Sequence, residues 1–179
     1  RKGDKPIKEF IKVQNAALSN GLSIQEQSKR NPFKKGEFIF TPTIQKVFKQ
    51  AEKIADANDI TTFISGETGT GKEVLAKHIH KKSRRSKFPF IAIDCGAVSD
   101  NLIQSMLFGH IEGAFTDAIK SSKGAFLEAH RGTLFLDEIG NISQKLQQTL
   151  LRVLQEREIA PVGSFKKTKV DVRVITATH

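Results

Sequence analysis

A glycine-rich stretch that ends in lysine has the residue types and spacing best suited to chemistry in this 179-residue chain. Residues 66–73 read Gly-Glu-Thr-Gly-Thr-Gly-Lys-Glu and follow the apolar run of residues 60–64. Glycines let the backbone curl until successive N–H groups point at one anion, and a helix start adds the positive end of its dipole. Lys72 would supply a mobile ammonium group for the outer phosphates. The pattern predicts a nucleoside triphosphate site made of Gly66, Glu67, Thr68, Gly69, Thr70, Gly71, Lys72 and Glu73.

Glu73 stands where such loops usually have a serine or threonine whose hydroxyl reaches Mg²⁺. Magnesium would then be held mainly by phosphate oxygens, water and a carboxylate from elsewhere in the chain. The alternative is a glycine-rich turn that binds nothing. It is disfavoured because a strand pattern precedes the turn and a helical pattern follows it.

Two carboxylates at the end of an apolar run form the second candidate motif. Residues 132–138 read Gly-Thr-Leu-Phe-Leu-Asp-Glu, which suits a parallel strand buried on both faces. Open α/β sheets bind their ligands at the carboxyl ends of such strands. We expect Asp137 to orient magnesium through water and Glu138 to polarise the attacking water as a general base. Alone, the run could be an ordinary strand-to-loop exit, but after a phosphate loop it indicates hydrolysis of the nucleotide.

The composition limits the class of protein. Hydrophobic content of 38% and charged content of 27% are typical of a soluble globular protein. No apolar stretch reaches the length of about 18 residues that a membrane span needs. The single Cys95 excludes an internal disulfide and a cysteine-based zinc site, and it fits a reducing cytoplasm. The histidines are scattered, so we expect no cluster of metal ligands.

Positive charge is concentrated in two parts of the chain, whose net charge is +10. Residues 1–35 hold nine Lys/Arg against three Asp/Glu, and residues 74–93 hold six Lys/Arg and no acid. The second run could meet nucleic acid phosphates, although a solvated helix end is the favoured interpretation. Its members are Lys77, Lys81, Lys82, Arg84, Arg85 and Lys87.

A parallel sheet is needed to position these motifs. Apolar spacing predicts strands that alternate with helices, which indicates an α/β fold with right-handed crossovers. The expected strands are residues 60–65, 88–94, 133–137 and 172–176. The expected helices begin after the caps Thr41, Ser99 and Ser143 and at residue 71, and a hairpin or insertion is expected at residues 159–170.

The chain divides into two parts of different composition. Residues 1–37 are expected to be a basic linker or the tail of an upstream domain, in which residues 7–18 could form a short helix. Residues 38–179 are expected to form the nucleotide-binding domain.

One segment between the second and third strands does not belong to a minimal nucleotide-binding domain. Residues 107–118 read Leu-Phe-Gly-His-Ile-Glu-Gly-Ala-Phe-Thr-Asp-Ala and show little periodicity. Phe115 could be buried, but its small and polar neighbours favour a loop tip that presents an apolar side chain for recognition.

Together with the run Leu-Leu-Arg-Val-Leu-Gln-Glu-Arg-Glu at residues 150–158, these motifs resemble bacterial enhancer-binding proteins. These proteins are the AAA+ ATPases that activate RNA polymerase carrying sigma-54. The resemblance covers residues 38–179, and the loop signature is specific to that family. It implies a three-layer α/β sandwich with the strand order 5-1-4-3-2. The fifth strand and a helical lid would follow this chain, so strand one would be an exposed edge.

The resemblance also implies ligands, partners and residue roles. ATP and Mg²⁺ would bind between the subunits of a ring, usually a hexamer, and hydrolysis would raise a loop that contacts sigma-54. Asp94 holds the position of the switch residue that reports γ-phosphate through Glu138, and His179 falls where a polar γ-phosphate sensor is expected. The loop tip would be Gly113, Ala114, Phe115, Thr116, Asp117 and Ala118.

Two residues depart from the family pattern. Asp117 puts a negative charge where the family usually has glycine, which predicts a weakened or altered contact with sigma-54. Asp94 replaces the more frequent asparagine, and an ionised Asp94 would repel Glu138 instead of holding it. The family's trans-acting arginines and its DNA-binding helix-turn-helix would also follow this chain. We therefore expect the chain alone to hydrolyse ATP slowly or not at all.

Three functions are open at this point. The first is the ATPase domain of a sigma-54-dependent activator in the bacterial cytoplasm. The second is a catalytically impaired nucleotide-binding relic or fragment, which the departures at Asp94 and Asp117 favour. The third is a ring ATPase that acts on nucleic acid, which the basic run at residues 74–93 favours.

Overall fold

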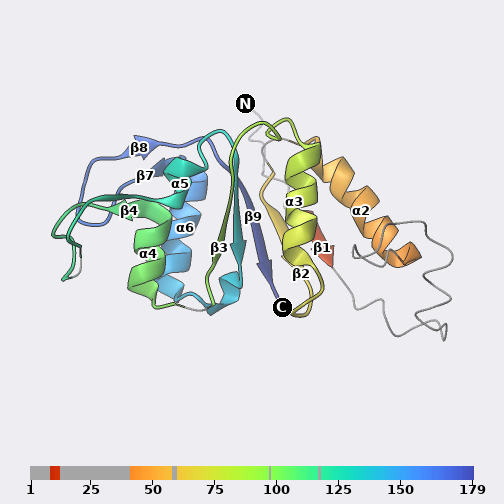
Figure 1. Ribbon diagram of the computed structural model, residues 1–179, viewed down its shortest axis with the longest axis horizontal. Helices are drawn as coiled ribbons and strands as arrows, with labels where there is room; N and C mark the ends of the chain where they lie inside the picture. The colour runs from red at the N-terminus through yellow and green to blue at the C-terminus, as the bar shows by residue number, and fades with distance from the viewer. Residues whose placement is uncertain (1–8, 13–40, 58–59, 97, 117) are drawn as a thin grey trace, which may run out of the picture.

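A five-stranded parallel sheet is the centre of the fold (Figure 1). The computed structural model describes residues 9–12, 41–57, 60–96, 98–116 and 118–179. All neighbouring strands run parallel. In spatial order they are β1 (Glu9–Lys12), β2 (Thr62–Ser65), β9 (Arg173–Thr178), β6 (Thr133–Asp137) and β3 (Phe90–Asp94). The α/β class and the relative order of the four expected strands are confirmed.

Helices cover both faces of the sheet and make it a three-layer sandwich (Figure 1). On one side lie α2 (Pro42–Ala55) and α3 (Lys72–Lys82). On the other side lie α4 (Asp100–Phe108), α5 (Ala125–Glu128) and α6 (Gln144–Glu156).

Side chains alternate across β6 and β9, and this alternation builds two cores. Leu134, Leu136 and Val174 pack in the cluster that includes residues of α4, α5 and α6. Phe135 and Ile175 pack instead in the cluster that includes residues of α2 and α3. Because both faces are covered, these strands appear in the sequence as continuous apolar runs.

Polar caps fix where the helices begin. Thr41 Oγ1 accepts a hydrogen bond from Ile44 N at 3.3 Å at the start of α2. Ser143 Oγ accepts one from Leu146 N at 3.4 Å at the start of α6. Ser99 occupies the cap position of α4, but its side chain makes no capping hydrogen bond. All three predicted helix starts are confirmed.

The edge of the sheet beside β2 differs from the expectation. β1 pairs in parallel with β2, from Glu9 opposite Thr62 to Lys12 opposite Ser65. The expected exposed edge is therefore paired, and the short helix expected at residues 7–18 is wrong for residues 9–12. The free backbone groups on that side of β2 offer a template for another strand, and an isolated short helix has little stability of its own. The rest of residues 1–37 lies outside the described residues, so the linker and the domain boundary stay predictions.

Two short antiparallel hairpins lie at the outer end of the α4 and α6 layer. β4 (Gly109–His110) pairs with β5 (Ser122–Lys123), and β7 (Glu158–Ile159) pairs with β8 (Thr168–Lys169). A backbone bridge between His110 and Val162 joins the two hairpins. The second hairpin confirms the hairpin expected at residues 159–170.

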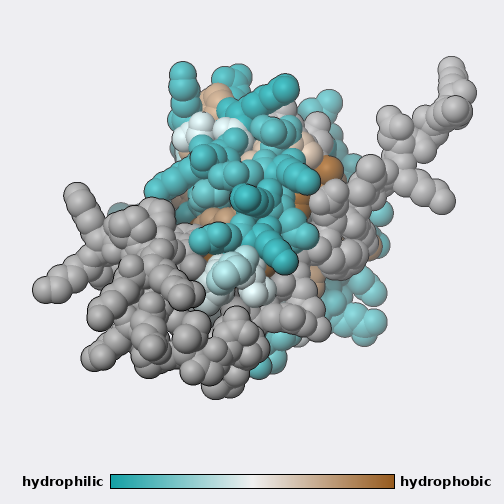
Figure 2. Space-filling view, turned by 90° about the vertical axis from the view of Figure 1, so that its right-hand side faces the viewer, coloured by the Kyte–Doolittle hydropathy of each residue, from teal (hydrophilic) through white to brown (hydrophobic). Residues whose placement is uncertain are grey.

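The surface over α2 is mostly hydrophilic wherever described residues show (Figure 2). No helix of the described part of the chain is long and apolar enough to cross a bilayer.

Candidate nucleotide-binding site

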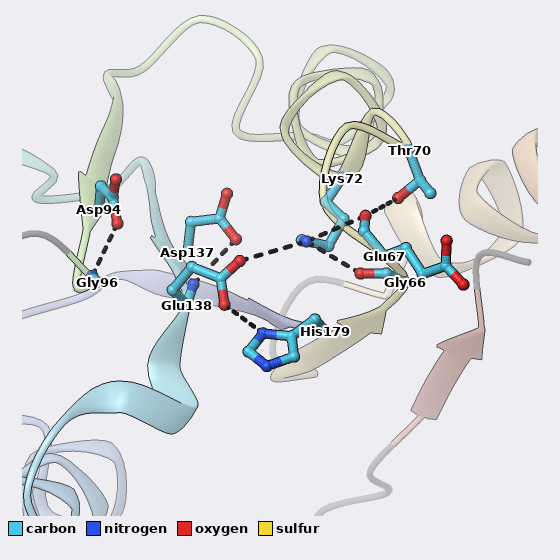
Figure 3. Close-up of polar contacts among 9 residues, drawn as sticks. All are labelled: Gly66, Glu67, Thr70, Lys72, Asp94, Gly96, Asp137, Glu138 and His179. Atoms are coloured by element: carbon cyan, nitrogen blue, oxygen red, sulfur yellow. Dashed lines mark hydrogen bonds and ion pairs between the residues drawn. The ribbon is translucent and has the colours of Figure 1, made fainter. Parts of the chain in front are cut away.

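Four strands bring the predicted site residues to one edge of the sheet (Figure 3). Because β2, β3, β6 and β9 are parallel, their carboxyl ends meet at this edge. The phosphate loop follows β2, Asp94 ends β3, Asp137 ends β6 and His179 follows β9. Asp94 and Asp137 are direct neighbours in the register of β3 and β6.

Hydrogen bonds hold the phosphate loop as a compact turn. Gly66 N donates to Thr178 O of β9 at 3.2 Å, which ties the start of the loop to the sheet. Thr70 donates to Glu67 O from both its backbone N, at 3.3 Å, and its Oγ1, at 2.7 Å. Hydrogen bonds to β9 and within the loop, from both backbone and side chain, therefore shape the loop without a ligand.

The end of the loop presents a helix N-terminus. Gly71, with φ of 86°, is the cap of α3 and supplies no side-chain capping bond. This left-handed backbone is one that glycine adopts without strain. The N–H groups of the first turn of α3 can therefore serve an anion. Glu73 Oε1 lies 2.7 Å from Lys77 Nζ, so the Glu73 carboxylate forms an ion pair one turn along the exposed surface of α3.

Lys72 is buried, with 5% of its side chain exposed. Its Nζ donates to Gly66 O at 3.0 Å and to Glu67 O at 3.4 Å, and it lies 3.6 Å from Glu138 Oε1 (Figure 3). Since a buried ammonium group needs hydrogen-bond partners, these oxygens offset the burial of Lys72 inside the loop. Phosphate oxygens could take over the same role.

Glu138 has an unusual backbone. It lies between β6 and the 3-10 helix η1 (Ile139–Asn141), with φ of 51° and ψ of 41°. Its N–H donates to Asp137 Oδ1 at 2.9 Å. A non-glycine residue in this left-handed region is uncommon and concentrates at functional sites. The turn directs the Glu138 side chain toward Lys72 and His179 (Figure 3).

His179 and Lys72 together perturb the Glu138 carboxylate. Glu138 Oε2 lies 2.9 Å from His179 Nδ1. The hydrogen bond from His179, followed by the charge of Lys72, holds the pKa of Glu138 below its ordinary value, while burial acts in the opposite direction. Glu138 is therefore ionised at neutral pH, as a base that must accept a proton from water requires.

Asp94 makes its hydrogen bond within its own turn. Its Oδ1 accepts from Gly96 N at 2.8 Å. Within the described residues no hydrogen bond joins Asp94 to Glu138, yet both border the same glycine. A Cβ at Gly96 would lie 3.3 Å from Asp94 Oδ1 and 3.3 Å from Glu138 Cβ. The role of Asp94 as a switch stays a prediction.

The site offers few protein ligands for a metal ion among the described residues. Among the described residues there is no group of three or more His, Cys, Asp or Glu side chains placed to hold a metal ion. Asp137 Oδ1 is already an acceptor for Glu138 N. Its second oxygen is a hard ligand of the type that magnesium prefers, so Asp137 fits one ligand position beside phosphate oxygens and water.

The predicted partner loop lies away from the nucleotide edge, beyond α4 (Figure 1). Gly113 N donates to Ala118 O and Ala118 N donates to Phe115 O, both at 2.9 Å, so the tip is a closed turn. Phe115 is 38% exposed and Thr116 is exposed, as expected for a tip, whereas Ala118 is buried. Asp117 lies outside the described residues.

His110 is a residue that the sequence alone did not single out. Its ring contacts Ser105 of α4, Lys120 after the tip and Phe115 at the tip. The available signal was its place directly before the tip segment, but its partners become apparent only when the loop is folded.

Comparison with known proteins identifies the family. Residues 39–179 match the family described as the Sigma-54 interaction domain. The chain is 50% identical over 158 residues to the acetoin dehydrogenase operon transcriptional activator AcoR of Bacillus subtilis, covering 87% of this chain and 26% of AcoR. It is also 50% identical over 139 residues to the Nif-specific regulatory protein of Azotobacter vinelandii, covering 78% of this chain and 26% of that protein.

A solved structure supports the same assignment. NtrX from Brucella abortus in complex with ATP superposes with a TM-score of 0.69 and 31% identity, covering 79% of this chain and 30% of NtrX. This chain therefore spans 26–30% of the length of these relatives. On this evidence the chain belongs to the sigma-54 interaction domain family, the AAA+ domain of sigma-54-dependent transcriptional activators.

Proposed function

We propose that this chain is the ATP-hydrolysing domain of a transcriptional activator that works with sigma-54. In the proposal, hydrolysis in a ring oligomer drives remodelling of the closed complex of RNA polymerase. The observation that carries it is the convergence on Glu138, whose carboxylate lies 3.6 Å from Lys72 Nζ and 2.9 Å from His179 Nδ1. In the proposal, Lys72 binds phosphate, Glu138 is the base and His179 is the polar sensor. Their contacts with one another would bring all three to the terminal phosphate of ATP.

Nucleotide binding is supported by the loop and by a relative. NtrX was solved in complex with ATP and with ADP. In this chain the first N–H groups of α3 and Lys72 would bind the phosphates. Lys72 Nζ would exchange its bonds to Gly66 O and Glu67 O for bonds to phosphate oxygens. Magnesium, when bound, neutralises phosphate charge, and Asp137 would be its protein ligand.

The chemical step would depend on Glu138. Its carboxylate would accept a proton from the water that attacks the terminal phosphate, and it is ionised at neutral pH, as this role requires. His179 would hold one carboxylate oxygen and so orient the base. When γ-phosphate draws His179 or Lys72 away, Glu138 would be released, which gives these two residues a sensing role.

The loop at residues 111–118 would carry the signal to sigma-54. Phe115 and Thr116 are exposed at the closed tip and would make the contact. The ring, the RNA polymerase contact, DNA binding through a further domain and location in the bacterial cytoplasm are parts of this proposal that follow from membership of the family.

Capture of sigma-54 tests the proposal. The chain in its natural full-length context would be mixed with purified sigma-54 in the presence of ADP or of ADP with a γ-phosphate mimic. We expect capture with the mimic and little with ADP, and no capture by the Phe115→Ala variant. Absence of capture under all nucleotide conditions would contradict the sigma-54 function. Nucleotide binding without any turnover, unchanged by Glu138→Gln, would indicate the impaired relic instead.

A further inference from the structure

His110 connects the tip of the partner loop to the body of the domain. Its Nδ1 lies 2.6 Å from Ser105 Oγ, a side chain of α4 that is buried. Its Nε2 lies 2.9 Å from Lys120 O, just after the tip. Its ring centroid lies 5.0 Å from that of Phe115, with the planes at 64°. One side chain thus contacts α4, the segment of the loop that returns toward β5 and the apolar residue at the tip.

The hydrogen-bond chemistry assigns a direction to these contacts. A carbonyl oxygen can only accept, so the hydrogen between His110 Nε2 and Lys120 O is on the histidine. In the neutral ring Nδ1 then accepts from the Ser105 hydroxyl. In the charged ring Nδ1 donates to the same oxygen, because a hydroxyl can do either. Both ring nitrogens are satisfied in either state, so the ring is fixed in one orientation.

The backbone on either side of His110 is fixed as well. Ile111 N donates to Val162 O at 3.1 Å, and Val162 N donates to Gly109 O at 2.9 Å. These bonds join the loop to the β7–β8 hairpin on both sides of the histidine. The backbone that carries the imidazole is therefore held in place, and the ring itself has three defined contacts. Among the ring contacts of the described residues, Phe115 pairs only with His110.

We propose that His110 is a positioning residue for the partner loop. Its imidazole holds the Phe115 ring against the domain. It therefore sets how much of the Phe115 side chain is exposed for sigma-54 before ATP binding and hydrolysis move the loop. The consequence for sigma-54 rests on the proposed function. The positional claim itself does not, since it concerns contacts within this chain.

A single tryptophan tests the positional claim. The chain contains no Trp and no Tyr, so Phe115→Trp would be its only indole emitter. We expect acrylamide to quench this emission less than that of Phe165→Trp, because Phe165 is 102% exposed. Adding His110→Ala should raise the quenching constant of Trp at position 115 by about twofold, toward the Phe165→Trp value.

Matched variants separate positioning from general loss of structure. Ser105→Ala should raise the same quenching constant, because it removes one partner of the His110 ring. Ser164→Ala removes a hydroxyl from the neighbouring hairpin, where it accepts from Lys166 N at 3.1 Å, and should leave the quenching unchanged. His110→Gln keeps a donor for Lys120 O and should give an intermediate value. Equal quenching with and without His110 would overturn the proposal.

The second readout measures coupling. In the sigma-54 capture experiment, His110→Ala should lower the ratio of capture with the γ-phosphate mimic to capture with ADP by about tenfold, while nucleotide affinity stays unchanged. A side chain that served stability alone would lower both captures and leave their ratio as it was. If the unaltered protein captures no sigma-54 at all, the proposed function fails, and the fluorescence result still decides the role of His110.

Discussion

The two oxygens of the Glu138 carboxylate have different partners. Lys72 Nζ lies 3.6 Å from Oε1, and His179 Nδ1 lies 2.9 Å from Oε2. Both partners favour the ionised carboxylate, and the hydrogen bond from His179 contributes most to the lowered pKa. The pKa of Glu138 is therefore lowered by two residues that come from different elements and from distant parts of the sequence.

Replacing Glu138 by glutamine tests its role as the base. The amide keeps the size of the side chain but cannot accept a proton from water. We expect ATP turnover of the assembled protein to fall by about 10²-fold or more, with nucleotide affinity almost unchanged. Steady-state phosphate release and titration calorimetry measure the two quantities. Turnover that survives the substitution would assign the base to another residue.

Replacing His179 by alanine tests the cause of the lowered pKa. A depressed carboxylate pKa keeps Glu138 ionised at neutral pH, and the ionised form is lost only as the pH falls through the folded-state value. Without His179 the pKa should rise toward its ordinary value. The acidic limb of the rate–pH profile should therefore move to higher pH. An unmoved limb would show that Glu138 does not control it.

At the scale of elements, the β4–β5 hairpin depends on a close backbone approach at Gly109. This residue has φ of 80°, and a Cβ placed on it would lie 2.4 Å from Ser122 O and 2.8 Å from Gly124 N. Backbone atoms cannot move aside as a flexible side chain can. The glycine thus allows the two strands at the base of the partner loop to meet.

Gly109→Ala should destabilise the domain by about 3 kcal/mol, since backbone strain and overpacking add together. Gly113→Ala is the matched control, because Gly113 has φ of 76° but nothing within 4 Å of an added Cβ. It should show only the cost of the strain, about 1 kcal/mol. Urea unfolding followed by circular dichroism measures both values. Equal destabilisation by the two variants would contradict the role of the close approach.

The β1–β2 pairing gives a second prediction at this scale. Ile11 lies opposite Ile64 in the parallel register. Ile11→Pro removes a backbone donor from β1 and fixes a φ that disfavours continuous pairing. Hydrogen exchange of the β2 amides should accelerate, while nucleotide affinity, which depends on the loop after β2, stays the same. Unchanged exchange would show that β1 does not protect β2 in solution.

At the scale of the whole molecule, the charge is unevenly distributed. Lys81, Arg84 and Lys87 lie at and after the C-terminal end of α3, and all three are exposed. Lys82 nearby lies 3.4 Å from Glu52 Oε1, and Arg85 is turned inward to donate to Asp171. The basic run is thus divided between the buried Arg85, which is bonded within the domain, and cations on the surface.

The third candidate function, a ring ATPase that acts on nucleic acid, predicts a salt-dependent, sequence-independent affinity of these exposed cations for DNA. Changing Lys81 and Lys87 together to glutamine should weaken DNA binding and reduce the slope of log K against log salt by about 0.9 for each phosphate that is no longer neutralised. Fluorescence anisotropy with a labelled duplex measures this slope. DNA that also stimulated ATP turnover would favour a ring ATPase acting on nucleic acid.

The sequence predicted local features better than long-range ones. The run at residues 133–137 coincides with β6, and the caps Thr41 and Ser143 start their helices. These features were predictable because burial pattern and capping depend on residues that are close together in the sequence. The strand at residues 9–12 was missed because it is defined by its partner across the sheet. The convergence of His179 on Glu138 follows from strand order, which the family resemblance supplied and periodicity could not.

The left-handed backbone of Glu138 affects how its variants should be interpreted. Any replacement there changes two things, the reactive group and the ease with which the main chain turns into η1. Asparagine and aspartate tolerate this conformation better than alanine does. Glu138→Asp should therefore isolate the effect of shortening the side chain, whereas Glu138→Ala combines a missing carboxylate with a less favourable bend and overstates the share of catalysis due to the carboxylate.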